Sequence, residues 1–132
     1  MTRKSESGSA IVEFVLLAIP LFLPILLFIG EFSVLSSAEM ASRTLVREVV
    51  RAFVTAENEA DARARSSAVM EFAAQKLGFS TSEIATMRLS FDCSLNPCFT
   101  SGGEVRATLQ FSLSGSGRQV TALAREFVSP WQ

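Results

Sequence analysis

Few residues of this 132-residue chain have the types and spacing that chemistry requires. Histidine, the commonest general base and metal ligand, is absent. The two cysteines are too few for a structural zinc site, and their C-x4-C spacing is not that of the redox motif C-x-x-C. Glu104 and Glu126 could meet across a sheet, but nothing indicates that either carboxylate is buried. We therefore predict that the chain is no enzyme and has no catalytic residue, metal or cofactor.

A loop disulfide is the chemistry that Cys93 and Cys98 suit best. Turn-forming residues lie between and after them, and two segments of alternating polarity flank the loop. A bond between them would contribute about 2 kcal/mol on the chain-entropy model. Because disulfides persist in the periplasm and are rare in bacterial cytosol, the bond would indicate an exported domain. Two free thiols are the alternative.

An uncharged apolar run extends from Phe14 to Gly30 and is the element that must position Glu13. At about 1.5 Å per residue, a helix over residues 10–30 spans roughly 30 Å, the thickness of a hydrocarbon core. The basic residues Arg3 and Lys4 precede the run and favour a cytoplasmic N-terminus. The length of the apolar run makes membrane lipid an expected partner. The formal net charge of −1 gives no basic field that would indicate nucleic acid.

Pro20 and Pro24 lie one turn apart within this run. Each proline removes an N–H group and crowds the carbonyl four residues earlier, which predicts a helix kink. Membrane helices tolerate such prolines, so the pair does not distinguish one kind of anchor from another.

Three interpretations of the apolar run stay open on these residues. A secretory signal peptide could be cleaved after Ala38, although the run is longer than the usual 7–15 residues and Glu13 lies within its start. The run could also be a plain, unprocessed membrane anchor. The third interpretation uses Glu13 together with the residues before it.

Gly8, followed by S-A-I-V-E-F over residues 9–14, resembles the leader motif of type IV pilin-like proteins. In that motif a prepilin peptidase cleaves after the glycine, and glutamate is the fifth mature residue. The longer string over residues 8–20 and Gly30-Glu31-Phe32 are similar to the TadE-like minor pilins of tight-adherence (Flp-type) pilus systems. The first mature residue would be Ser9, whereas type II secretion pseudopilins usually begin with phenylalanine.

The resemblance implies a minor pilin or pseudopilin that acts in pilus assembly and adhesion. It would be a single-pass protein of the bacterial inner membrane, with a cytoplasmic leader (1–8), a transmembrane segment (9–30) and a periplasmic α+β pilin-like domain (31–132), later incorporated into an extracellular pilus. The implied partners are prepilin peptidase, other pilin and minor pilin subunits and the inner-membrane assembly platform. The alternative is a secreted or membrane-tethered binding module.

The resemblance assigns cleavage to Gly8 and Ser9, and registration against neighbouring subunits to Glu13. A charged side chain at mid-bilayer costs about 3 kcal/mol on insertion scales, so this carboxylate needs a partner or a shallow position. Cleavage would create an amine on Ser9, which is i,i+4 to Glu13 and so lies on the same helical face. The amine could pair within its own chain or reach the Glu13 of a neighbour. A glutamate that only snorkels to the interface is the alternative.

Beyond Gly30 the pattern predicts that the long helix continues as a stalk to about Thr55. An apolar stripe lies on one side, and Glu39, Arg43, Arg47 and Arg51 follow one another at four-residue spacing on another. Glu39 and Arg43 have the favourable order for an i,i+4 pair. This arginine row could dock an acidic partner or could simply be solvated. The stripe consists of Phe32, Leu35, Ser42, Leu45, Val46, Val49 and Phe53.

The remaining residues predict a second amphipathic helix and a small antiparallel sheet of about three strands. The helix should extend from about Glu59 to Leu77, with Gly78 as a left-handed cap. Strands are predicted over 87–92, 104–113 and 118–128, although 118–128 also fits a helix. The apolar face of the second helix is expected at Ala68, Val69, Phe72, Ala73 and Leu77.

Overall fold

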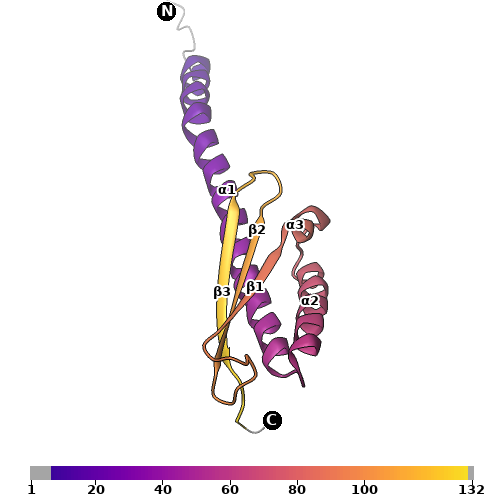
Figure 1. Ribbon diagram of the computed structural model, residues 1–132. Coiled ribbons are helices and arrows are strands. Elements are labelled where there is room, and N and C mark those ends of the chain that lie inside the picture. The colour runs from indigo at the N-terminus through magenta and orange to yellow at the C-terminus, as the bar shows by residue number, and fades with distance from the viewer. Residues whose placement is uncertain (1–6, 131–132) are drawn as a thin grey trace, which may run out of the picture. The chain divides into compact units, whose positions relative to one another are not determined.

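The computed structural model describes residues 7–130 of an α+β chain, which divides into two units, Met1–Ser36 and Ser37–Gln132. Residues 1–6 of the predicted leader lie outside the described residues. The predicted fold class is confirmed, with a long N-terminal helix, a second helix and a three-stranded antiparallel sheet (Figure 1). The elements are α1 (Ser7–Val54), α2 (Glu59–Lys76), α3 (Thr81–Thr86), β1 (Arg88–Cys93), β2 (Glu104–Ser112) and β3 (Gln119–Phe127).

In the first unit, α1 is a helix whose described side chains are almost all exposed. The large apolar side chains from Ile11 to Ile29 are 44–72% exposed. Pro20 and Pro24 both lie inside the helix, and the kink that they predict stays a prediction. Length and composition allow this part of α1 to cross a membrane.

The second unit has its own hydrophobic core, to which the C-terminal part of α1 contributes. The predicted stripe is confirmed from Ser42 onward, whereas Phe32 is 64% exposed and Leu35 is half-buried. The inner face of the sheet supplies the other side of this core. The fully buried residues are Leu45, Val46, Val49, Val50 and Phe53 of α1, Ala62 and Ala74 of α2, and Val105, Ala107 and Leu109 of β2.

The sheet has the strand order β1-β2-β3, with both pairs antiparallel. The alternation predicted for β2 is confirmed, since its apolar residues from Val105 to Phe111 are buried. The third strand is also confirmed, and the alternative of a helix over 118–128 is wrong. A tight turn joins β2 to β3, with Gly115 and Gly117 at positive φ and a 2.8 Å hydrogen bond from the Leu113 N–H to the Arg118 carbonyl.

Helix α2 begins and ends with the capping chemistry that its sequence contains. The Asn58 side chain accepts a 2.9 Å hydrogen bond from the Asp61 N–H. At the other end, Gly78 has a φ of 85°, and the N–H groups of Gly78 and Phe79 bond to the carbonyls of Gln75 and Ala74. These two hydrogen bonds together form the Schellman motif, so the predicted cap at Gly78 is confirmed.

The predicted buried face of α2 is wrong. Phe72 is 64% exposed and Leu77 is 38% exposed, while the buried residues are Ala62, Ser66 and Ala74. The Ser66 hydroxyl donates a 3.3 Å hydrogen bond to the Val49 carbonyl of α1. Small side chains allow two helices to approach closely, and α2 therefore buries its small residues rather than its large ones.

Helix α3, which the sequence analysis missed, is held by the buried carboxylate of Glu83. Its N-terminus is a capping box, in which Ser80 and Glu83 bond each other's backbone N–H groups. The same carboxylate accepts hydrogen bonds from the N–H (3.0 Å) and hydroxyl (2.9 Å) of Ser114, in the turn after β2. Burial raises the pKa of Glu83, but its hydrogen bonds to Ser80 and Ser114 lower it by more, so the pKa lies below its ordinary value.

We predict that Glu83 stabilises the fold at neutral pH and loses this effect in acid. Because its folded pKa is lowered, the contribution is fully present above the ordinary pKa of 4.5 and disappears as the pH falls through the folded pKa. Glu83→Gln should lower the free energy of unfolding at pH 7 by about 1–3 kcal/mol, and the variant should lose less stability than the native chain between pH 6 and pH 3. Urea unfolding of the full chain in detergent micelles measures both effects.

The matched control is Glu71→Gln, which changes an exposed carboxylate on α2. It should leave both the neutral stability and the acid slope unchanged. Equal pH profiles for the native chain and Glu83→Gln would contradict the account.

Candidate functional site

The surface around Glu13 on α1 is the first candidate site. The carboxylate borders a hollow in the helix surface that Phe14, Leu17, Ala18, Leu21 and Phe22 complete. None of the most apolar window of this helix is buried within the chain. Such a surface needs lipid or other apolar helices around it, because exposed apolar area of this size is unfavourable in water.

Helix α1 brings the sequence-predicted residues of this region to one face. On a regular helix, successive residues are about 100° apart, so Pro20 and Pro24 lie within about 20° of Glu13 around the axis. The prolines leave the carbonyls of Leu16 and Pro20 without their usual helical donors. Gly8 and Ser9 belong to the start of the same helix. The face thus combines a carboxylate with backbone acceptors, which suits a cationic or N–H-bearing neighbour.

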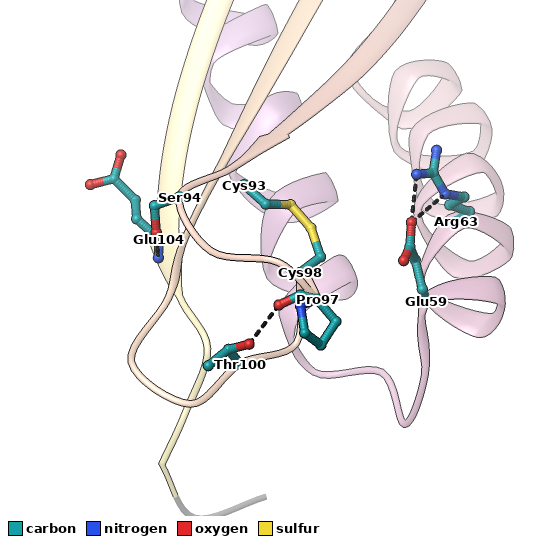
Figure 2. The surroundings of a disulfide bond; sticks show 8 residues. All are labelled: Glu59, Arg63, Cys93, Ser94, Pro97, Cys98, Thr100 and Glu104. Carbon is teal, nitrogen blue, oxygen red and sulfur yellow. Dashed lines mark hydrogen bonds and ion pairs between the residues drawn. A yellow bond between two sulfur atoms is a disulfide. The ribbon is translucent and has the colours of Figure 1, made fainter.

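The disulfide loop is the second predicted feature, and the Cys93–Cys98 bond is confirmed, with the two Cα atoms 5.4 Å apart. The alternative of free thiols is wrong. Two hydrogen bonds join Ser94 to Glu104 at the start of β2, one from the Ser94 N–H to the carbonyl (2.9 Å) and one from the Glu104 N–H to the hydroxyl (2.8 Å). Figure 2 shows the disulfide at the end of β1. Within the same loop, the Thr100 hydroxyl donates a 2.6 Å hydrogen bond to the Pro97 carbonyl.

An aromatic stack, which the sequence analysis missed, fastens this loop to α1. The ring of Phe53, which is fully buried, stacks on Phe91 at a centroid distance of 4.2 Å and on Phe99 at 5.4 Å. Phe91 precedes the disulfide and Phe99 follows it. These aromatic residues on both sides of the cysteines were the signal in the sequence from which the stack could have been predicted.

The arginine row of α1, defined as Arg43, Arg47 and Arg51, is exposed in the second unit. Glu39 and Arg43 do not form an ion pair among residues 7–130. The i,i+4 ion pairs of that range are Glu59–Arg63 and Asp61–Arg65, both on α2. Arg47 lines an open cleft of about 370 Å³ beside β3, together with Leu123, Ala124, Arg125 and Glu126.

The other residues considered for chemistry do not form a site. Glu104 pairs with Phe127, and Glu126 with the inward-facing Val105, so the two carboxylates project from opposite faces of the sheet and do not meet. Glu104 lies 3.6 Å from Arg106 and 3.8 Å from Arg125 instead. Within residues 7–130, no group of His, Cys, Asp or Glu side chains is arranged to hold a metal ion.

These features define a class of protein, one with a membrane-compatible N-terminal helix that continues into a small disulfide-bonded α+β domain. Residues 8–51 match the family described as TadE-like protein. The match confirms the predicted resemblance to TadE-like proteins of the tight-adherence pilus system, a family of structural components. It includes Glu13, both prolines and the arginine row, and it ends before α2. No curated protein and no solved structure matched the chain.

We predict that the disulfide stabilises the domain by about 2 kcal/mol on the chain-entropy model, because it closes only a short loop. Cys93→Ser combined with Cys98→Ser should lower the free energy of unfolding of the full chain in micelles by that amount under non-reducing conditions. Adding a reductant should lower the stability of the native chain and leave the variant unchanged. A native chain that resists unfolding equally with and without reductant would contradict the prediction.

Proposed function

We propose that this TadE-like protein is a minor pilin or pseudopilin, a structural subunit of a tight-adherence (Flp-type) type IV pilus. Prepilin peptidase would cleave it after Gly8, and the apolar part of α1 would then pack among the corresponding helices of other subunits. The observation that carries the proposal is the exposed apolar helix with one carboxylate near its start. The family match over residues 8–51 supports it.

Glu13 has a specific task in this assembly. Helices within lipid gain little from apolar contact with each other, so packing and polar pairs decide which helices associate. A carboxylate among apolar neighbours is stabilised by a cation, and the Ser9 amine of a processed chain is such a cation. Pairing between neighbouring chains would fix the axial position of one helix against the next.

We also propose the membrane arrangement that this function needs. Residues 1–8 would be the cytoplasmic leader, 9–30 the transmembrane segment in the inner membrane and 31–132 the periplasmic domain. The Cys93–Cys98 disulfide supports an oxidising location for the domain. Before the helix leaves the membrane, its partners would be the assembly platform and membrane lipid. Adhesion would be a role of the assembled pilus.

A second candidate is a secreted or membrane-tethered binding module. The division between the two units falls between Ser36 and Ser37, two residues before the signal-peptide cleavage considered after Ala38. A signal sequence near the N-terminus meets the same criteria of length and hydropathy as a membrane span, although this apolar run is longer than the usual 7–15 residues. This alternative gives a mature chain that begins at Glu39 and lacks Glu13.

We predict that Glu13→Ala leaves processing intact and reduces incorporation into pilin assemblies at least tenfold, which corresponds to about 1.4 kcal/mol. The reason is that the Ser9 amine of the neighbour loses its counter-ion. Photo-crosslinking from a residue in the apolar segment measures the adducts with other pilin subunits in intact cells.

The control is Glu31→Ala, which removes the other carboxylate bordering the apolar run. It should retain the adducts. Wild-type adduct levels in Glu13→Ala, or an absence of adducts in the native chain, would argue against the proposed function.

A further inference from the structure

The outer edge of β3 is a long and regular row of unpaired backbone groups. β3 has nine residues, contains no proline and pairs only with β2 among the described strands, without a break in register. Leu123 and Phe127 are 47% and 64% exposed along it. An edge of this kind is a template on which another strand can add.

The hydrogen bonds at the two ends of the β2–β3 pair define which residues face this edge. Leu113 bonds to Arg118 at one end, and Val128 bonds to Gly103 at the other. Hydrogen-bonded pairs alternate along an antiparallel ladder, so the even-numbered residues from 120 to 126 face β2. The backbone N–H and C=O groups of the odd-numbered residues, among them Leu123 and Arg125, therefore point away from the sheet.

The cleft beside this edge has an excess of positive charge. Arg47 and Arg125 line it with one carboxylate, Glu126. Arg125 has a distant contact, 3.8 Å, with Glu104, and no ion pair of residues 7–130 includes any arginine of the arginine row. Arg43 and Arg51 lie one turn before and one turn after Arg47. Two exposed carboxylates lie beside the row: Glu48, which follows Arg47 directly and precedes Arg51 by three residues, and Glu39, one turn before Arg43.

We propose that this edge and the arginine row together bind an extended acidic segment of a partner protein, which adds to β3 as a fourth strand. Arginines four residues apart on a helix are about 6 Å apart along its axis. Alternate residues of a strand point to the same side and are about 6.6–6.8 Å apart. A segment with Glu or Asp at alternate positions can therefore place successive carboxylates near successive arginines while its backbone pairs with β3.

The described strands of this chain do not have that chemistry, which argues against a second copy as the occupant. The face of β3 that points to the core carries Ala122, Ala124 and a single carboxylate, Glu126. The opposite face of the strand carries Arg125. On β1, Asp92 is the sole carboxylate. The site lies in the second unit and goes beyond the proposed function, because it requires neither cleavage after Gly8 nor Glu13.

The test uses the full chain in detergent micelles and two labelled peptides, T-E-V-E-V-E-T and T-K-V-K-V-K-T, with blocked ends. Fluorescence anisotropy should show saturable binding of the acidic peptide at least tenfold tighter than that of the lysine peptide. Hydrogen exchange should slow at the amides of Leu123 and Arg125 when the acidic peptide binds. Equal binding of both peptides would overturn the proposal, as would self-association of the chain through β3 that excludes the peptide.

Two variants separate the charge from the edge. Arg47→Glu should weaken binding of the acidic peptide at least tenfold. Leu123→Pro removes an outward N–H without removing a bond to β2, so it should also weaken binding while circular dichroism stays native. Arg88→Glu on β1, at the opposite edge, is the matched control and should bind as the native chain does. If Arg47→Glu binds the acidic peptide with native affinity, the proposed site is wrong, even if Leu123→Pro fails to fold.

Discussion

The apolar part of α1 needs an apolar environment that the described chain does not provide, and the other features of the N-terminal unit follow from this need. Its large side chains from Ile11 to Ile29 are exposed along the whole segment. Lipid can provide this environment, and in the proposed assembly other helices of the same kind would provide it later. Within such surroundings a single carboxylate becomes a strong determinant of position, because it is stable only near a cation or close to the membrane edge. In the proposed assembly, Glu13 would therefore be the residue that gives an otherwise non-directional surface a fixed register.

The second unit meets a different constraint, since it must fold in water around a small core. The same helix that is exposed around Glu13 buries Leu45, Val49 and Phe53 further along. The Phe53 ring stacks on aromatic residues at both ends of the disulfide loop, and Glu83 joins α3 to the turn between β2 and β3. Each of these contacts connects segments that are distant in sequence. The same unit has the edge of β3 beside Arg47 of the arginine row, where residues from two elements line one cleft.

Periodicity predicted most of this fold, because long apolar and alternating patterns leave few alternatives. The bounds of α2, the strands and the disulfide followed from such patterns. The buried face of α2 did not, since its contact with α1 uses Ala62, Ser66 and Ala74, which carry little hydrophobic signal. Helix α3 was too short for periodicity, although the S-x-x-E spacing of Ser80 and Glu83 was legible as a capping box. The cleft required the tertiary arrangement of α1 and β3, which no local pattern contains.

The mass of the mature chain tests the central claim most directly. The chain should be purified from membranes of cells with and without prepilin peptidase, and a Gly8→Leu variant should be purified from cells that have it. We predict a mass that corresponds to Ser9–Gln132 only for the native chain in the presence of the peptidase, with Met1 retained in the other two samples. A native chain that keeps Met1 in both kinds of cell, or that begins at Glu39, would contradict the account.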